Sequence, residues 1–247
     1  MKGKAAIVTG AAAGLGCATA LKLAQAGADV SLVDIDANKL AAVADEVRVL
    51  GVKALVQVVD LAVADNCPAV VAAAVDAFGR LDALCNVAAV MIPSHTPEMP
   101  VAAFQTTLAV NLAAPFYLIQ AAIPHLLETH GAVVNVTSAV GIVAQAYTAA
   151  YCATKAALNH MTKSLAMEYM HKPIRFNAVA PGGMMTALAR NMLSLQNGDP
   201  SLMARCSPLR GLVELDDVAD MVVFLASDAA KGHHGSVIVI DKGITAG

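Results

Sequence analysis

Tyr151 and Lys155 are the residues of this chain best suited to acid–base chemistry. They stand four positions apart, so in a helix over residues 150–171 both side chains would share one face. An isolated tyrosine is a poor base because its pKa is about 10, and a neighbouring ammonium group favours the phenolate. Lowering that pKa to about 7 requires roughly 4 kcal/mol, because one pKa unit corresponds to about 1.36 kcal/mol. One partly solvated lysine hardly supplies this, so the pair indicates a second positive charge nearby, such as an oxidised nicotinamide ring.

Neither this pair nor Ser138, thirteen residues before Tyr151, is specific by itself. A Tyr-x-x-x-Lys spacing arises by chance in many helices, and an isolated serine of this kind is more often a strand-end or capping hydroxyl. The pair becomes informative only together with a dinucleotide-binding segment elsewhere in the chain.

The N-terminal segment offers such a site, with the order strand, glycine turn, helix. Residues 5–9 form an apolar run that suits a buried parallel strand, and residues 17–26 have the pattern of a helix. Gly10, Gly14 and Gly16 stand between them. Glycines let the backbone approach a pyrophosphate, and a helix N-terminus offers free N–H groups and the positive end of its dipole. Glycines also serve ordinary tight turns, but their place after the first strand favours dinucleotide binding.

Asp34 ends the next apolar run, residues 30–33, eighteen residues after Gly16. This is close to the spacing of a carboxylate that binds the adenosine ribose hydroxyls of a dinucleotide. Alternatively, Asp34 or Asp36 caps a helix over residues 37–50, and both roles can hold if Asp36 is the cap. The glycine loop and the residues immediately after Asp34 contain no arginine or lysine to pair with a 2′-phosphate. The sequence therefore predicts NAD rather than NADP.

These elements belong to a regular alternation of strands and helices. It predicts a doubly wound parallel sheet of about seven strands, a Rossmann-type α/β fold with helices on both faces, in a single domain over residues 1–247. We expect strands at 5–9, 30–33, 54–59, 82–86, 132–136, 174–179 and 237–240, and helices at 17–26, 37–50, 65–79, 101–129, 150–171 and 215–226. Asp65 is the expected cap of the third helix, and the fourth is expected to break near Pro115. Ligands bind at the carboxyl ends of the strands of such sheets, where we expect Gly10, Asp34, Asp60, Asn86, Ser138 and Pro181.

The composition excludes several classes of protein. Apolar residues make up 57% of the 247 residues and charged residues 14%, so disorder is excluded and some apolar surface is expected to face partner subunits. The net charge of −3 gives no case for binding nucleic acid or an anionic membrane. Residues 99–127 and 131–154 carry no Asp, Glu, Lys or Arg and are long enough to span a bilayer. Polar residues interrupt both, so we expect buried core, subunit interface and a homotetramer instead.

The cysteines and histidines point to a reducing compartment and to no metal. The five cysteines are scattered and odd in number, and the seven histidines show no metal-binding spacing. We therefore expect reduced thiols in a cytoplasmic protein. The first residues run directly into a strand, so no signal peptide is expected.

In order and spacing these motifs resemble the short-chain dehydrogenase/reductase family over essentially the whole chain. The matching elements are the Thr9–Gly16 loop, Asn111, Ser138, Tyr151-x-x-x-Lys155 and Pro181-Gly182-x-x-x-Thr186. The resemblance implies that Tyr151 exchanges a proton with the substrate oxygen and that Ser138 hydrogen-bonds this oxygen. It implies that Lys155 lowers the pKa of Tyr151 and holds the nicotinamide ribose, and that Asn111 positions a water that links Lys155 to solvent. The hydride chemistry itself belongs to the cofactor.

The expected binding residues follow the same pattern. By resemblance, Asp60 would approach the adenine, Asn86 the adenosine and Thr186 the nicotinamide carboxamide. The expected cofactor set is Gly10, Ala13, Gly14, Leu15, Gly16, Asp34, Ile35, Asp60, Leu61, Asn86, Tyr151, Lys155, Pro181, Gly182, Met184 and Thr186. The expected substrate set is Ser138, Val140, Gln145, Tyr151 and Met185.

The chain departs from the family pattern at three places. Residues 86–89 read Asn-Val-Ala-Ala where the family usually has Asn-Asn-Ala-Gly, so the loop toward Met91 could take another path. Cys152 replaces the common serine, with little expected effect. Residues 241–243 read Asp-Lys-Gly in place of Asp-Gly-Gly, which puts close backbone packing there in question.

The expected substrate walls are residues 140–147, 90–93 and 184–208. The last segment contains four methionines and is either a mobile lid or a stretch whose methionines fill core gaps. Arg190 and Arg205 are the only arginines or lysines of these walls, so we expect an uncharged, fairly apolar secondary alcohol or ketone as substrate.

Two other functions are considered. A 3-oxoacyl-carrier-protein reductase of the same fold is disfavoured by Asp34, because that role usually goes with NADP and a basic patch for the carrier. A catalytically idle dinucleotide-binding regulator is disfavoured by the complete set of Asn111, Ser138, Tyr151 and Lys155, because binding alone needs neither the serine nor the tyrosine.

Overall fold

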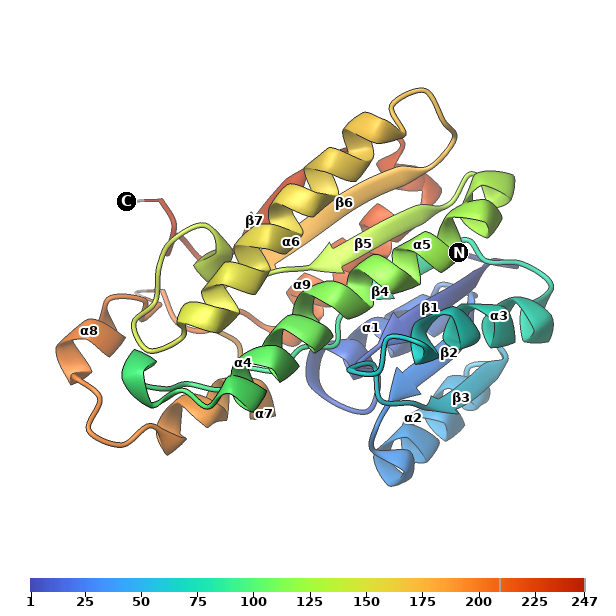
Figure 1. Ribbon diagram of the computed structural model, residues 1–247. Helices are drawn as coiled ribbons and strands as arrows, with labels where there is room; N and C mark the ends of the chain where they lie inside the picture. Colours follow the sequence, from blue (N-terminus) through green and yellow to red (C-terminus); the bar gives the residue numbers. More distant parts are fainter. Residues whose placement is uncertain (209, 247) are drawn as a thin grey trace.

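The computed structural model describes residues 1–208 and 210–246, and its strands form one parallel sheet. Within these residues the sheet has seven strands in the order β3-β2-β1-β4-β5-β6-β7 (Figure 1). They are β1 (Ala5–Thr9), β2 (Asp29–Asp34), β3 (Ala54–Val58), β4 (Ala83–Asn86), β5 (Ala132–Val136), β6 (Arg175–Pro181) and β7 (Val237–Ile240). The chain order reverses between the paired strands β1 and β4, which opens a crevice at their carboxyl ends. The predicted doubly wound fold is confirmed.

Helices cover both faces of this sheet (Figure 1). Buried residues of α1 (Gly14–Gln25), α2 (Ala37–Val49) and α9 (Leu215–Ala226) share one apolar cluster with the strands. Buried residues of α3 (Asn66–Phe78), α5 (Ala114–Thr129) and α6 (Ala149–Glu168) belong to a second cluster. The sheet is therefore the middle of three layers, and the loops that follow the strands lie at its carboxyl edge.

Two predicted helix boundaries are corrected. α1 begins at Gly14 rather than at residue 17, so Gly14 and Gly16 lie in its first turn. A Cβ atom at position 16 would lie 2.0 Å from the carbonyl oxygen of Gly10, so only glycine allows the helix to start this close to β1. α6 ends at Glu168 rather than at residue 171.

The caps of α2 and α3 differ. Asp36 caps α2, because its carboxylate accepts a hydrogen bond from the Lys39 N–H at 3.1 Å. Asp65 stands at the N-cap position of α3, but among the described residues its side chain makes no capping hydrogen bond, contrary to expectation. Its backbone is helical, with φ −65° and ψ −17°, whereas side-chain capping requires an extended residue.

The helix over residues 101–129 does not break near Pro115, contrary to the expected break. α4 (Val101–Leu108) continues through a π-helical turn (Ala109–Ala113) into α5. The Ala114 N–H accordingly donates to the carbonyl of Ala109, five residues back. Pro115 has no N–H to offer the carbonyl of Asn111, and the wider turn accommodates this loss without ending the helix.

By length and composition this is also the one described helix that could cross a membrane. Its inner face nevertheless packs in the second apolar cluster, through Leu118, Ile119 and Leu126. Its outer face leaves Phe104 and Phe116 exposed by 44% and 43%. The helix is thus a layer of the α/β fold with an apolar outer surface.

The C-terminal turn keeps close backbone packing despite its departure from the family pattern. A Cβ atom on Gly182 would lie 2.8 Å from the Cα of Asp241, so the two backbones touch. Lys242 takes a left-handed backbone, with φ +51°, which a glycine would adopt at lower cost. The Asp241 carboxylate stabilises the turn by accepting hydrogen bonds from the N–H groups of Gly243 and Thr245.

Candidate active site

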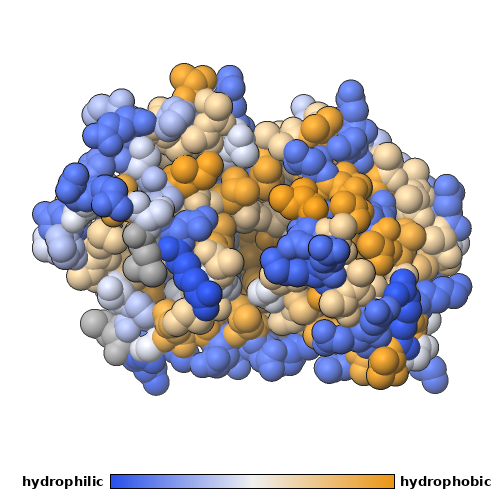
Figure 2. Space-filling model, turned by 90° about the horizontal axis from the view of Figure 1, so that it is seen from below, coloured by the Kyte–Doolittle hydropathy of each residue, from blue (hydrophilic) through white to orange (hydrophobic). Residues whose placement is uncertain are grey.

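A cavity of about 460 Å³ lies at the carboxyl ends of β1, β4, β5 and β6. The space-filling view shows the molecule hollowed near its middle, with apolar residues around the hollow (Figure 2). Predicted site residues from distant parts of the chain line this cavity together: Gly10, Ala13, Gly14, Leu15, Gly16, Asp34, Ser138, Val140, Gln145, Tyr151, Lys155, Pro181, Gly182, Met184 and Thr186.

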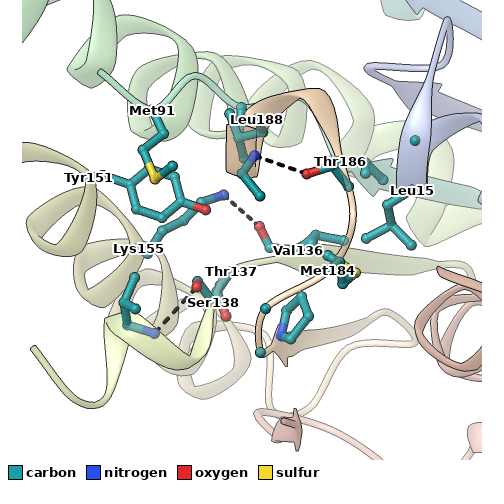
Figure 3. Close-up of a pocket in the computed structure, with 18 of the residues that line it drawn as sticks. Leu15, Met91, Val136, Thr137, Ser138, Tyr151, Lys155, Met184, Thr186 and Leu188 are labelled. Carbon is teal, nitrogen blue, oxygen red and sulfur yellow. Dashed lines mark hydrogen bonds between the residues drawn. The ribbon is translucent and has the colours of Figure 1, made fainter. Parts of the chain in front are cut away.

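Tyr151, Lys155 and Ser138 surround one central space (Figure 3). Tyr151 is only 8% exposed. Its burial raises the pKa of Tyr151 to about 12, although a hydrogen bond with Ser138 acts in the opposite direction. Ser138 also accepts a hydrogen bond from the Val140 N–H at 3.3 Å, which fixes its hydroxyl. Ser138 is therefore both a cap, of the turn Ala139–Gly141, and a wall of the cavity.

Lys155 enters the cavity from α6, one turn after Tyr151. Its ammonium donates to the carbonyl of Val136 at 2.8 Å and lies 5.6 Å from the centroid of the Tyr151 ring. Burial lowers the pKa of Lys155 to about 7. Desolvation therefore exceeds the effect of this lysine on Tyr151.

Asn111 is fully buried in the π-helical turn, and its side chain connects two segments by hydrogen bonds. Its side chain accepts from the N–H of Val90 and donates to the carbonyl of Val90, both at 2.8 Å. It also donates to the hydroxyl of Thr154 at 3.2 Å, next to Lys155 on α6. These bonds tie the loop after β4 to the helix that carries Tyr151. The water suggested by the family resemblance stays a prediction.

Asp34 lines the cavity at the end of β2, and its carboxylate is firmly oriented. One oxygen accepts from the Ala12 N–H of the glycine loop at 3.0 Å. The other accepts from the N–H groups of Ile35 and Asp36, at 2.7 and 3.1 Å. Each carboxylate oxygen has further acceptor capacity. The group can therefore accept hydrogen bonds from ribose hydroxyls without giving up its backbone contacts.

Six predicted residues lie outside the described lining of this cavity: Ile35, Asp60, Leu61, Asn86, Asn111 and Met185. Ile35 and Met185 are 71% and 63% exposed. The Asp60 carboxylate accepts from the Ala62 N–H at 2.8 Å and so shapes its own loop. Asn86 donates to the side chain of Asn135 at 2.8 Å, while its own amide oxygen is buried without a partner among the described residues.

The loop after β4 follows a path held by Thr9. The Thr9 hydroxyl accepts from the N–H groups of Val87 and Ala88, at 2.9 and 3.0 Å. A Cβ atom on Gly10, whose φ is +69°, would lie 2.9 Å from the Cα of Ala88. The substituted loop therefore still packs directly on the first glycine, and its residues 87–89 line the cavity.

Several lining residues were not among the predicted site residues. Some of them lie within the expected substrate walls at 90–93 and 184–208, namely Met91, Ala187, Leu188, Ala189, Met192 and Cys206. The others belong to no predicted set and are Val87, Ala88, Ala89, Val136, Thr137, Ala139, Gly183 and Ile244. Val136 and Thr137 directly precede Ser138, so their place at a strand end is a usable signal. Ile244 has no local signal, because only the C-terminal turn brings it back to β6.

The site fits a dinucleotide. α1 begins at the cavity, and its N-cap residue Ala13 has no side-chain acceptor to occupy the first N–H groups of the helix. Glycines at positions 10, 14 and 16 leave the loop without side chains on that side, and Asp34 stands at the end of the next strand. Lys155 also lines the cavity, and Thr186 lies beside the glycine loop, because a Cβ atom on Gly14 would be 3.6 Å from its methyl group.

Comparisons with known proteins agree with this geometry. A family model described as enoyl-(acyl carrier protein) reductase matches residues 10–245. The chain is 36% identical to a 2,5-dichloro-2,5-cyclohexadiene-1,4-diol dehydrogenase from Sphingobium indicum, over 100% of this chain and 98% of that protein. It is 34% identical to a cyclohexanol dehydrogenase from an Acinetobacter species, over 98% and 95% of the two chains. A short-chain dehydrogenase from Mycobacterium paratuberculosis bound to NAD superimposes with a TM-score of 0.93 at 27% identity, over 100% and 99% of the two chains.

Proposed function

Because the chain belongs to the short-chain dehydrogenase/reductase family, we propose that it is an NAD-dependent oxidoreductase that interconverts an uncharged, fairly apolar secondary alcohol and its ketone. The observation that carries this function is that Ser138, Tyr151 and Lys155 line one cavity together with the glycine loop. A regulator that only binds a dinucleotide needs the loop but gains nothing from a buried phenol beside a serine hydroxyl.

Each group of the site has a chemical task. The nicotinamide, when bound, donates or accepts the hydride. Ser138 hydrogen-bonds the substrate oxygen, and Tyr151 takes the alcohol proton in oxidation or returns it in reduction. Lys155, in its charged form, favours the phenolate of Tyr151. Because burial raises the pKa of Tyr151 to about 12, the phenolate needs both this ammonium and the cationic oxidised ring.

We further propose that the substrates are cyclic secondary alcohols. Two of the relatives described above are dehydrogenases named for cyclic alcohols. The lining on the side of Tyr151 is largely apolar, with Met91, Val140, Leu188 and Met192. Such a wall binds a compact hydrocarbon ring by burying its surface, at about 25 cal/mol per Å².

The test is a substrate screen with purified protein and NAD, followed by NADH absorbance. Cyclohexanol is expected to be oxidised with a kcat/KM at least about 10-fold above that of ethanol, because its ring buries several more methylene groups, each worth about 0.8 kcal/mol. Tight NAD binding without NADH formation from any secondary alcohol would support the idle regulator instead.

A 3-oxoacyl-carrier-protein reductase is the second candidate, favoured by a relative of that name from Thermotoga maritima that is 34% identical to this chain over 99% of its length. Asp34 disfavours it, because the carboxylate lies in the cavity where a 2′-phosphate of NADP would have to bind. Reduction of acetoacetyl-carrier protein with NADPH is therefore expected to be slower than reduction of cyclohexanone with NADH.

We also propose that residues 1–247 act as a single domain in which residues 184–208 form a lid over the substrate. The lid supplies Leu188, Met192 and Cys206 to the cavity wall.

We propose a cytoplasmic location as well. The five cysteines are free thiols, which a reducing compartment favours.

We propose, finally, that the protein is a homotetramer. Apolar side chains on the outer faces of α4, α5 and α6 are exposed, among them Val101 by 72%, Phe104 by 44% and Met167 by 69%. Exposed apolar groups in such number favour a covered interface. β7 lies at the edge of the described sheet and could form a second one.

Light scattering at micromolar concentration is expected to give about four times the chain mass of 25.2 kDa. Phe104→Glu together with Phe116→Glu is expected to yield smaller particles, because burying unpaired carboxylates is costly. The exposed pair Asp45→Ala with Glu46→Ala on α2 is a matched control and should leave the mass unchanged. A wild-type particle of 25.2 kDa would rule the tetramer out.

A further inference from the structure

Tyr147, four residues before Tyr151, has an unusual backbone conformation and a hydroxyl that contacts the lid. Its backbone is left-handed, with φ +67°, which is a strained conformation for a bulky aromatic residue. Such strain persists only where the surroundings enforce it. A glycine would take this backbone freely, so the side chain itself must provide a compensating contact.

That contact is with the lid. The hydroxyl of Tyr147 accepts a hydrogen bond from the Asp199 N–H at 2.8 Å. The Tyr147 ring packs edge-on against His95, with 5.0 Å between the ring centroids, and a ring nitrogen of His95 lies 3.1 Å from the carbonyl oxygen of Gln196. The carbonyl of Tyr147 accepts a hydrogen bond from the Ser94 N–H at 2.9 Å. This bond, next to His95 in the chain, holds the Tyr147 and His95 rings together.

Two further hydrogen bonds hold the lid, one in its first half and one near its C-terminal end. The side chain of Asn191 donates to the carbonyl of Met91 at 3.1 Å. Near the C-terminal end, the thiol of Cys206 donates to the carbonyl of Ala144 at 3.2 Å. Between these points, the hydrogen bonds that reach residues 195–199 from described residues outside the lid come from Tyr147 and His95.

Tyr147 itself is not among the described residues that line the active-site cavity. It lines a separate surface groove with Ile92, Met99 and Phe104. Its hydroxyl contacts the lid, which carries Leu188 and Met192 into the cavity, so Tyr147 can act on a bound substrate through the lid.

We propose that Tyr147 is a positioning residue whose hydroxyl, supported by the ring of His95, latches residues 195–199 and so holds the lid closed over the substrate. The proposal rests on the proposed function for its kinetic readout, but the latch can also be measured without any substrate. Loss of one neutral hydrogen bond corresponds to about 1 kcal/mol, or about 5-fold in the closed population.

Tyr147→Phe removes the hydroxyl and keeps the ring. In NAD-saturated enzyme we expect the KM for cyclohexanol to rise about 3- to 10-fold with kcat within about twofold, because the open lid weakens binding without touching Tyr151. Trypsin should cleave after Arg190 and Arg205, both in the lid, about 3- to 10-fold faster. Tyr169→Phe is a matched control, since its ring packs on Phe176 at 5.5 Å, away from the lid, and neither quantity should change.

A second set of variants tests the donor. Asp199 has φ −70°, which proline also adopts, so Asp199→Pro removes the N–H with little backbone change. Asp199→Ala keeps the N–H and removes only the carboxylate that caps α8 (Pro200–Ala204). The effect of Asp199→Pro beyond that of Asp199→Ala should match the effect of Tyr147→Phe. In a double variant with Tyr147→Phe, the loss of the Asp199 N–H should cause no further change in KM or in the cleavage rate.

The two readouts separate the possible failures. Unchanged KM and unchanged cleavage in Tyr147→Phe would overturn the latch, as would full additivity in the double variant or a fall in kcat alone. Faster cleavage in an enzyme that oxidises no alcohol would support the latch and reject the proposed function.

Discussion

Tyr151→Phe is expected to abolish turnover while NAD still binds. The phenol oxygen is the group placed beside Ser138 in the cavity, and phenylalanine keeps the ring and its packing while removing the proton carrier. A positioned acid or base contributes about 10²–10⁴-fold to a rate. Steady-state NADH formation measures the loss, and calorimetric titration with NAD measures the retained affinity.

Lys155→Met separates the tyrosine from its electrostatic support. Lys155 lies in the cavity near the expected nicotinamide riboside, so this variant should lose both rate and NAD affinity, unlike Tyr151→Phe. The Tyr151 assignment would be wrong if Tyr151→Phe retained more than about a tenth of the wild-type rate, a loss far below that of a positioned acid or base.

A cofactor switch at Asp34 is expected to have the second largest effect. The wild-type enzyme should prefer NAD, because the Asp34 carboxylate would repel a 2′-phosphate at close range. Two unit charges 4 Å apart repel by about 4 kcal/mol at an effective dielectric constant of 20. Screening and movement reduce this to a preference on the order of 10²-fold, or about 2.7 kcal/mol. Asp34→Ser with Ile35→Arg should raise kcat/KM for NADP and lower it for NAD.

Asp34→Asn is the matched control, because Asp34 also supports the glycine loop through the Ala12 N–H. The amide oxygen can keep that bond while the charge is removed, and the amide nitrogen replaces the oxygen that accepts from the N–H groups of Ile35 and Asp36. It should relax the discrimination without creating a preference for NADP, since no cation is added. The measurement is kcat/KM for both cofactors with one alcohol. Equal use of NAD and NADP by the wild type would mean that Asp34 does not read the ribose.

The sequence by itself determined the fold and predicted the catalytic group. Parallel strands buried on both faces are continuous apolar runs, so β1, β2 and β5 are readable from local pattern. Tyr151 and Lys155 are linked by helical spacing alone. Asp36 caps the helix as its position predicts, because capping depends on a few neighbouring residues. Asp34 accepts a hydrogen bond from the glycine loop, and its contact with the ribose stays a prediction.

Other features depended on contacts between distant segments. The start of α1 at Gly14 follows from the contact of Gly16 with Gly10 across the turn, not from helix propensity. The π-helical turn at Ala109–Ala113 resolves the missing N–H of Pro115 inside a packed layer, where a break would leave apolar surface exposed. Asn111 connects the loop after β4 to α6 because that turn places its side chain within hydrogen-bond distance of Val90 and Thr154.

The tertiary structure also decided the electrostatics of the site. From spacing alone, Lys155 should lower the pKa of Tyr151, but both groups are buried. Burial disfavours whichever form is charged, so it raises the pKa of Tyr151 to about 12 and lowers that of Lys155 to about 7. The lid contacts of Tyr147 and the return of Ile244 to the cavity likewise depend on long-range packing, for which no local pattern of residues exists.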